Sequence, residues 1–265
     1  MRTHPQIFLA VLLLLVSGCP APEAVRKEAP PPSPAGKTPS APEMSFILGT
    51  LDLSGYHGRI EDSSIAAFAK TVQGEKIDIL AVEGITRYPG VATRTDFVDR
   101  FAAAAGMRTA FGETITLNNR QGGNAVFSLF PIDSLVNTHY TEMDGIGFEA
   151  VLQAVIDCGV RDVVVASTHL PEKPGVAEET SALGTISVFA TIYPRTPVIV
   201  SGNLPHTAVM NPPAAFVPLP VRHPDAPSLW YTRDSSLTVR DARSEKTVFG
   251  RLLIVDFDLR RARTP

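Results

Sequence analysis

The sequence predicts a single domain of the α/β (α+β) class, with packed β-sheets and helices on the outside. Three observations favour this class. Hydrophobic residues make up 44% of the 265 residues, which is enough for one sizeable core. From residue 44 onward, apolar runs typical of strands alternate with amphipathic runs typical of helices. Several strand-like runs are joined by short turns, which favours hairpins and packed sheets.

Charge and cysteine content exclude several other classes of protein. The net charge is −3, so the composition gives no strong case for nucleic-acid binding driven by phosphate contacts. The two cysteines, Cys19 and Cys158, are too few for a disulfide framework. Collagen-like, coiled-coil and polytopic membrane proteins are excluded by the same composition.

Residues 1–18 have the features of a lipoprotein signal peptide. A short basic start precedes an apolar run, 7–16, that is too short to span a bilayer. The run ends at Val16-Ser17-Gly18-Cys19, which resembles the lipobox of bacterial lipoproteins. We therefore expect an exported chain that is lipidated at Cys19 and attached through that lipid to the bacterial cell envelope, with the inner or outer membrane left open. An ordinary signal peptide with an incidental cysteine is the alternative.

Residues 19–43 are predicted to be the lipidated cysteine followed by an extended tether. Positions 20–43 contain eight prolines. Such a segment has too few apolar side chains to bury a core, and its prolines favour an extended polyproline II conformation. The folded domain is therefore expected to occupy residues 44–265.

The first half of this domain is predicted as strand, helix, strand and helix. The expected elements are, in order, 46–53, 62–72, 77–82 and 93–105. Asp62 is a suitable N-cap for the first helix, and Gly106 is a suitable C-cap for the second. The near-continuous apolar run at 77–82 is typical of a strand that is buried on both faces.

The second half of the domain is richer in strands. We expect a helix at 176–193 and strands at 107–111, 124–128, 132–140, 148–156, 162–168, 197–201, 229–232 and 252–258. The strands at 148–156 and 162–168 are separated by Cys158-Gly159-Val160, which predicts a hairpin. The proline-rich stretch 205–227 is expected to be a long loop.

Five short segments, in order along the chain, resemble motifs of the endonuclease/exonuclease/phosphatase family, whose members have the DNase I-like fold. They are Thr50-Leu51-Asp52-Leu53, residues 77–83 ending in Glu83, residues 123–132, residues 163–170 containing Thr168-His169-Leu170, and residues 197–203 ending in Asn203. The resemblance covers nearly all of Met44 to Leu259. It implies a four-layer sandwich of two packed β-sheets flanked by helices, and the activity of a metal-dependent phosphoesterase.

Three residues match positions with a role in that family. Glu83 resembles its metal-binding glutamate, and His169 resembles its phosphate-contacting histidine. Asp52 replaces an asparagine but still offers an oxygen to a cation. Since carboxylates suit hard divalent cations, the resemblance implies that Asp52 and Glu83 hold Mg²⁺ or Mn²⁺ weakly, with no other cofactor. It also implies that Glu83 and His169 share one cleft.

Other catalytic positions of the family are lost in this sequence. Asn203 stands where the family has an aspartate, and Pro205 where it has an asparagine. Gly250 aligns with the general-base histidine, and Phe249 with the aspartate that orients it. Neither replacement accepts a proton, and losing groups that act together costs several orders of magnitude in rate. We therefore expect His169 and Asn203 to be remnants of a catalytic set.

Two functions remain open from the sequence. The first is a membrane-anchored lipoprotein whose degenerate domain binds an unknown ligand or protein partner and does not hydrolyse it. The second is a divergent divalent-metal-dependent phosphodiesterase, phosphatase or nuclease that acts outside the cytoplasm. The second needs a relocated base, for which His206 and His223 in the proline-rich loop are the candidates, although loop histidines are more often solvated surface residues.

Overall fold

The computed structural model describes residues 43–56, 59–89, 96–140, 149–170, 176–204, 212–219, 227–234 and 236–261. Contacts within the chain divide it into Met1–Ser40 and Ala41–Pro265, and every described residue belongs to the second unit. The predicted signal peptide, the lipidation site Cys19 and the tether up to residue 42 therefore lie outside the described residues. None of the described helices is long and apolar enough to cross a membrane.

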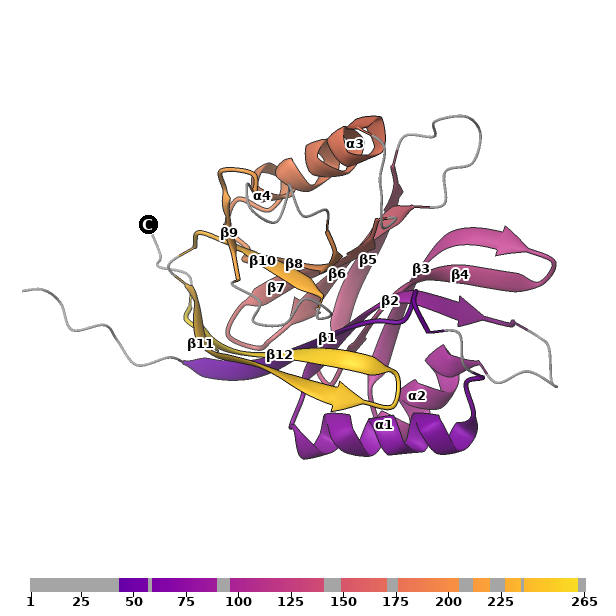
Figure 1. The fold of residues 1–265 in the computed structure, drawn as a ribbon. Coiled ribbons are helices and arrows are strands. Elements are labelled where there is room, and N and C mark those ends of the chain that lie inside the picture. The colour runs from indigo at the N-terminus through magenta and orange to yellow at the C-terminus, as the bar shows by residue number, and fades with distance from the viewer. Residues whose placement is uncertain are drawn as a thin grey trace, which may run out of the picture. The chain divides into compact units, whose positions relative to one another are not determined.

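Two six-stranded sheets form the centre of the domain (Figure 1). Sheet A has the strand order β11 (Leu237–Thr247), β12 (Gly250–Leu259), β1 (Met44–Asp52), β2 (Ile79–Arg87), β4 (Arg120–Ser128) and β3 (Arg108–Leu117). Sheet B has the strand order β5 (Ile132–His139), β6 (Ala150–Asp157), β7 (Asp162–His169), β8 (Val198–Asn203), β10 (Ser228–Thr232) and β9 (Phe216–Pro218).

The two sheets follow the same plan. A parallel pair lies in the middle of each, β1 with β2 in sheet A and β7 with β8 in sheet B. Antiparallel strands extend each sheet on both sides. Parallel neighbours need a crossover, which is α1 (Asp62–Gly74) in sheet A and α3 (Val176–Ser187) with α4 (Phe189–Ile192) in sheet B. Because parallel strands end at the same edge, each sheet presents two strand ends side by side.

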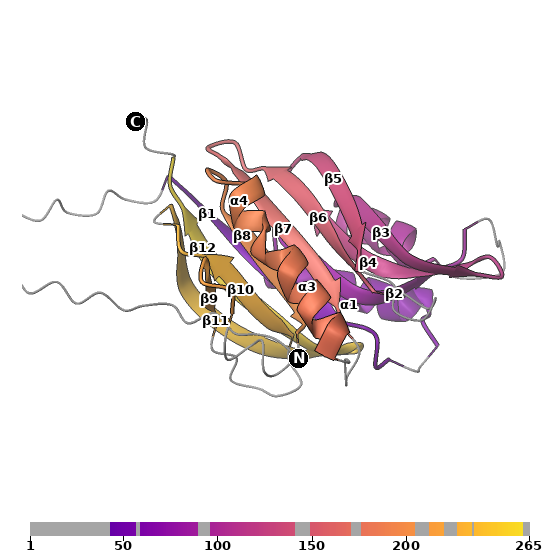
Figure 2. The same ribbon diagram turned by 90° about the horizontal axis from the view of Figure 1, so that it is seen from above.

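Three hydrophobic clusters separate four layers of structure. The cluster between the sheets contains Leu48, Ile79, Val165 and Val255. On the outer face of sheet A, α1 and α2 (Phe97–Ala105) bury a second cluster. On sheet B, a third cluster lies under α3 and α4, and Figure 2 shows α3 lying over the strands of this sheet. The predicted four-layer sandwich of two sheets flanked by helices is therefore confirmed.

The ends of the first two helices differ in part from the prediction. Asp62 is not the N-cap of α1; that position is Glu61, which makes no side-chain capping bond. The side chain of Asp96 caps α2 by accepting bonds from backbone N–H groups of its first turn. Gly106 ends α2 with a φ of 71°, a left-handed conformation that glycine adopts without steric cost.

Some helices and strands were not predicted correctly from the hydrophobic pattern of the sequence. Strand β11 was not predicted because its sequence is largely polar and charged, yet it pairs with β12 along its whole length. The short strand β9 lies within the stretch that we expected to be loop. The predicted helix at 176–193 is two helices, α3 and α4, separated at Val188.

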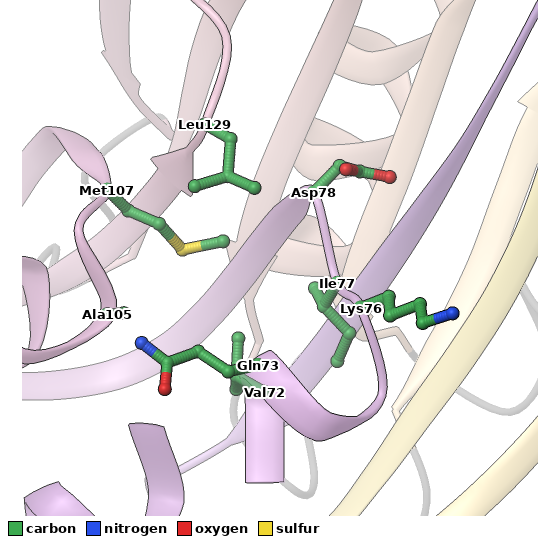
Figure 3. Close-up of a pocket in the computed structure, with 8 residues that line it drawn as sticks. All are labelled: Val72, Gln73, Lys76, Ile77, Asp78, Ala105, Met107 and Leu129. Carbon is green, nitrogen blue, oxygen red and sulfur yellow. The ribbon is translucent and has the colours of Figure 1, made fainter. Parts of the chain in front are cut away.

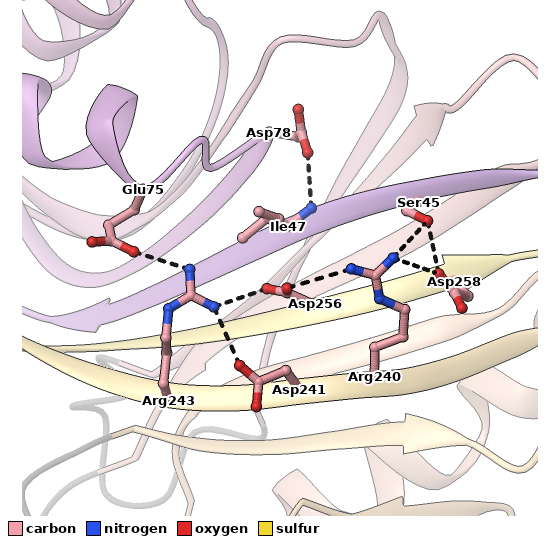
Figure 4. A network of polar contacts seen from close by, with 9 residues as sticks. All are labelled: Ser45, Ile47, Glu75, Asp78, Arg240, Asp241, Arg243, Asp256 and Asp258. Carbon is pink, nitrogen blue, oxygen red and sulfur yellow. Dashed lines mark hydrogen bonds and ion pairs between the residues drawn. The ribbon is translucent and has the colours of Figure 1, made fainter.

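Ion pairs join the two strands of the β11–β12 hairpin, and one of them ties the hairpin to the end of α1 (Figure 4). Arg243 of β11 contacts Asp256 of β12 at 3.0 Å and Glu75, after α1, at 2.9 Å. Arg240 lies 3.5 Å from Asp258. Both arginines are partly exposed, so each pair contributes at most about 1 kcal/mol. The network explains why a charged sequence is compatible with this edge strand.

Candidate functional site

The ends of the two parallel pairs meet between the sheets. Alternate residues of a strand share a face, so positions 48, 50 and 52 of β1 all point toward sheet B. The inward residues are apolar near the start of β1, β2, β7 and β8 and polar near the end. The core between the sheets therefore ends in a polar cluster formed by Thr50, Glu83, Ser167 and Ser201, with Asp52, His169 and Asn203 at the outer edge.

Glu83 is the centre of this cluster. Its side chain is 0% exposed. Its Oε1 atom accepts hydrogen bonds from the hydroxyls of Ser201 at 3.0 Å, Thr50 at 3.2 Å and Ser167 at 3.4 Å. The hydroxyls of Thr50 and Ser201 are 2.6 Å apart, and either one could donate to the other. Because each hydroxyl has one proton, the one that donates here does not donate to Glu83 at the same time. This contact links sheet A directly to sheet B. Glu83 therefore fastens the two sheets together at the point where the apolar core stops.

The environment of Glu83 favours its neutral form. Burial raises the pKa of this carboxyl well above its usual value, and the charge of Asp52 raises it further. The hydroxyl bonds oppose this shift only in part. The second oxygen, Oε2, is buried and has no hydrogen-bond partner among the described residues, which costs less for a protonated acid than for a carboxylate.

Asp52 and His169 lie at the rim of the cluster. Asp52 is the register partner of Glu83 in the β1–β2 pair. Its Oδ1 atom accepts a bond from the Ser54 backbone N–H at 2.8 Å and lies 3.8 Å from Nδ1 of His169. Burial lowers the pKa of His169, and the charge of Asp52 offsets part of that effect. The structure thus brings Asp52, Glu83 and His169 to one edge of the sandwich.

Asn203 ends β8 beside His169, its register partner on β7. Its side-chain amide donates to the backbone oxygen of Leu170 at 3.3 Å. The Leu170 N–H donates in turn to the backbone oxygen of Asn203 at 3.1 Å. The described contacts of Asn203 therefore hold two strand ends together.

Gly250 and Phe249, which align with the general base and its orienting residue, lie in different surroundings. Gly250 starts β12, and a Cβ atom added to it would lie 3.9 Å from the backbone oxygen of Asp52. Phe249 is 3% exposed and packs edge-on against Tyr56, Phe68 and Phe97. Gly250 therefore borders the site without a side chain, and Phe249 belongs to the helix-side core. Pro205, His206 and His223 lie outside the described residues.

Sequence reasoning assigned no role to the hydroxyl groups around Glu83. Thr50, Ser167 and Ser201 lie within the motifs, two residues after an inward apolar residue, and that spacing was the available signal. It also missed Asn124, whose amide donates to the Ala150 backbone oxygen at 3.0 Å across the sheets.

A resident hydrated divalent cation does not fit this cluster. Mg²⁺ keeps several of its waters when one or two carboxylates bind it, and Glu83 has no surface open to solvent. In the described part of the chain, no group of three or more His, Cys, Asp or Glu side chains is arranged to hold a metal ion. Weak binding of Mg²⁺ or Mn²⁺ by Asp52 and Glu83 stays a prediction.

A cavity of about 220 Å³ lies near the opposite end of β2 (Figure 3). Its apolar lining comes from Val72, Ile77, Ala105, Met107 and Leu129. The amide of Gln73 donates to a backbone oxygen at 3.2 Å, and the carboxylate of Asp78 accepts the Ile47 N–H at 2.8 Å. The side chains of Gln73 and Asp78 are thus engaged by the fold, and the cavity shares no lining residue with the Glu83 cluster.

Several solved structures have a backbone arrangement similar to that of this chain. An endonuclease/exonuclease/phosphatase from Beutenbergia cavernae has a TM-score of 0.63 at 16% identity, over 82% of this chain and 72% of that one. The catalytic domain of human Nocturnin, with bound sulfate, has a TM-score of 0.61 at 16% identity, over 82% and 94%. An endonuclease/exonuclease/phosphatase from Bacteroides vulgatus has a TM-score of 0.63 at 9% identity, over 82% and 100%.

No family model and no curated protein sequence matches the chain. At these identities the structural likeness concerns the arrangement of the backbone and not the activity. It agrees with the two sheets, the flanking helices and the meeting of strand ends described above. The chain has the DNase I-like fold of the endonuclease/exonuclease/phosphatase proteins.

Proposed function

We propose that this chain is a membrane-anchored bacterial lipoprotein whose domain binds a ligand or partner without hydrolysing a phosphoester. The position of Gly250 carries the proposal. This residue lies next to the backbone of Asp52, where the family alignment places a general base. A base has to lie within hydrogen-bond reach of the water that it activates, and glycine has no group that does so.

The state of Glu83 supports the same proposal. An active metal ligand has to be ionised and reachable by a hydrated cation. Glu83 is fully buried, and its oxygen Oε1 is engaged by three hydroxyls. This residue has the surroundings of a structural acid that joins the sheets.

One contact favours the alternative, a divergent phosphodiesterase or phosphatase. Asp52 and His169 approach to 3.8 Å at the accessible rim, which is an arrangement able to orient an imidazole. Catalysis would still need a base from elsewhere in the chain, and His206 and His223 are the residues to test.

The deciding experiment is a hydrolysis assay on the full chain in detergent. Mg²⁺ or Mn²⁺ is supplied with DNA, a simple phosphodiester and a phosphoinositide. We expect no turnover above that of the His169→Ala variant. Turnover that disappears in His169→Ala, while the circular dichroism spectrum is unchanged, would overturn the proposal. Loss in His206→Ala or His223→Ala would then identify the base.

A gain-of-function variant tests the role of Gly250 directly. Gly250 has a φ of 137°, so any side chain there is strained, and Gly250→Ala is the matched control for that strain. Metal-dependent hydrolysis in Gly250→His but not in Gly250→Ala would mean that the missing base limits the wild-type chain.

The anchor is tested separately by mass spectrometry of membrane-extracted protein. We expect a mature chain that begins at an acylated Cys19. The control is Cys19→Ser, which should be released without detergent. A wild-type chain that starts at another residue and leaves the membrane without detergent would contradict the anchor but not the binding role.

A further inference from the structure

The cavity beside sheet A lies where two helices end. Val72 and Gln73 belong to the last turn of α1, and Ala105 is the last residue of α2. Val72 and Ile77 are each 1% exposed, whereas Leu129 is 47% exposed. The lining therefore extends from the core under the helices to a leucine that is open to solvent, so a ligand that covers this leucine removes further apolar surface from water.

The lining selects an uncharged alkyl group as the body of the ligand. Its apolar residues are aliphatic or methionine, and no aromatic ring is among the described lining residues, so a flat ring finds no partner for stacking. In Figure 3 the charged ends of Lys76 and Asp78 point away from Met107 and Leu129. Methionine is flexible and adapts to the shape of what it contacts. A flexible alkyl chain therefore fits the side of the cavity formed by Met107 and Leu129.

The polar groups beside the cavity favour a hydroxyl as the other end of the ligand. The last carbonyl groups of a helix carry a partial negative charge. Both α1 and α2 end at the cavity, and neither has a basic residue in its last turn. The Asp78 side chain is a further hydrogen-bond acceptor. These groups accept a proton from a hydroxyl and repel a carboxylate.

We propose that this cavity binds a neutral amphiphile, an unbranched primary alcohol with a chain of about eight carbons. An apolar cavity of about 150 Å³ holds benzene, which has six carbons. In proportion, the cavity of about 220 Å³ holds about nine non-hydrogen atoms, which is the size of octan-1-ol. The inference is independent of the proposed function, because the cavity and the Glu83 cluster have no residue in common.

Nuclear magnetic resonance of the methionine methyl groups tests the site and its size. The full chain with Cys19→Ser is used without detergent, because the alkyl chains of a detergent would compete. We expect the Met107 signal to shift and saturate on titration with octan-1-ol. The Met44 signal is the internal control, because Met44 packs against the cluster between the sheets. An unchanged Met107 signal would overturn the proposal.

The dependence on chain length separates a cavity from a surface. From butan-1-ol to octan-1-ol, each added methylene should lower the dissociation constant about fourfold. Beyond decan-1-ol it should fall no further, because a longer chain exceeds the cavity. A fall that continues to dodecan-1-ol would mean adsorption on the surface and would overturn the proposal. Tighter binding of octanoate than of octan-1-ol would also contradict it, because the cavity would then select an anion.

Two variants locate the binding. Ala105→Leu fills the cavity and should weaken octan-1-ol binding by more than about tenfold. Ala103→Leu is the matched control, because Ala103 is exposed on the same helix and does not line the cavity. Leu129→Asn changes an exposed position, so the fold should be retained while binding weakens several-fold. Circular dichroism checks the fold of each variant. Unchanged affinity in both Ala105→Leu and Leu129→Asn would reject this cavity as the site.

Discussion

Sheet A and sheet B meet at one polar cluster but bring different chemistry to it. Sheet A contributes carboxyl groups, Asp52 and Glu83. Sheet B contributes hydroxyls and nitrogen groups, among them Ser201, His169 and Asn203. The sheets share a topology, yet the donors of one face the acceptors of the other. The comparison teaches that this polar cluster satisfies much of its polarity internally, because hydroxyls of sheet B donate to a carboxyl group of sheet A.

Each half also places a glycine next to its central polar residue. Gly84 follows Glu83 with a φ of 67°, and Gly202 follows Ser201 with a φ of 147°. Both backbone conformations are unfavourable for residues with a Cβ atom. Both sheets therefore require a glycine directly after the central polar residue. Alanine substitutions at Gly84 and Gly202 show which of the two glycines the fold needs more.

The largest effect is expected from Gly202→Ala. An added Cβ atom would overlap the backbone oxygen of Thr168, whereas at Gly84 it would lie 2.6 Å from the Ser54 nitrogen. Overpacking and backbone strain together should cost about 3 kcal/mol or more at Gly202 and somewhat less at Gly84. Urea unfolding measures both. Gly74→Ala is the control, because a Cβ there meets nothing within 4 Å. Equal stability of the Gly202 and Gly74 variants would contradict the close packing of β7 and β8.

Removal of Glu83 should be the next largest effect. Glu83→Ala leaves a cavity and removes the acceptor of three buried hydroxyls, which should cost about 2–4 kcal/mol. Glu83→Gln keeps the shape and an acceptor oxygen, and should cost less than about 1 kcal/mol. The free energy of unfolding near pH 5 separates the two variants. A large loss in Glu83→Gln would mean that the ionised carboxylate, and not the neutral acid, stabilises the fold.

The pH dependence should have opposite signs in the two halves. The folded pKa of Glu83 is raised above 4.5, so its contribution is complete below pH 4.5 and is lost as the pH rises toward the folded value. The folded pKa of His169 is lowered from 6.5, so its contribution is complete above pH 6.5 and is lost as the pH falls. The free energies of unfolding of Glu83→Gln and His169→Gln, measured across this pH range, separate the contribution of Glu83 from that of His169. A wild-type profile that Glu83→Gln leaves unchanged would contradict the raised pKa.

The smallest effect concerns Asn203. Asn203→Ala removes the bond to the Leu170 oxygen, and one such bond contributes about 1 kcal/mol. Val248→Ala, in the exposed turn before Gly250, should change the free energy of unfolding by less than about 0.5 kcal/mol. The thermal unfolding temperatures of Asn203→Ala and Val248→Ala measure this difference. If the two variants are equally stable, the Asn203 bond contributes nothing measurable.

The periodic pattern was sufficient to place most elements of the fold. Buried strands such as β2 and β8 contain nearly continuous apolar runs, and their hydrophobic side chains determine where they lie. The pattern failed for β11, because an edge strand with one side open to solvent needs few apolar residues. The pattern also failed to predict the break between α3 and α4 at Val188, because the apolar composition continues through this position.

The candidate site was only partly predictable. The motifs predicted Asp52, Glu83 and His169 at strand ends. In the structure Asp52 and His169 end β1 and β7, whereas Glu83 lies within β2, which continues to Arg87. The topology brought the three residues together. The state of Glu83 was not visible in the sequence, because its burial depends on hydroxyls from three other strands. The same glutamate, open to water, would be an ordinary ionised ligand.

The sequence by itself determined the class of the fold, because apolar periodicity is a local property, and the resemblance to the family implied the four-layer sandwich. Residue identity alone showed that position 250 has no side chain and that position 203 has an amide in place of a carboxylate. Only the tertiary structure decided that Glu83 is enclosed by Thr50, Ser167 and Ser201, and that Phe249 belongs to the core. Burial and hydrogen bonding depend on which strands become neighbours, and the Ser201 hydroxyl that donates to Glu83 lies 118 positions away in the chain. The chemical state of the site therefore follows from the packing of the two sheets.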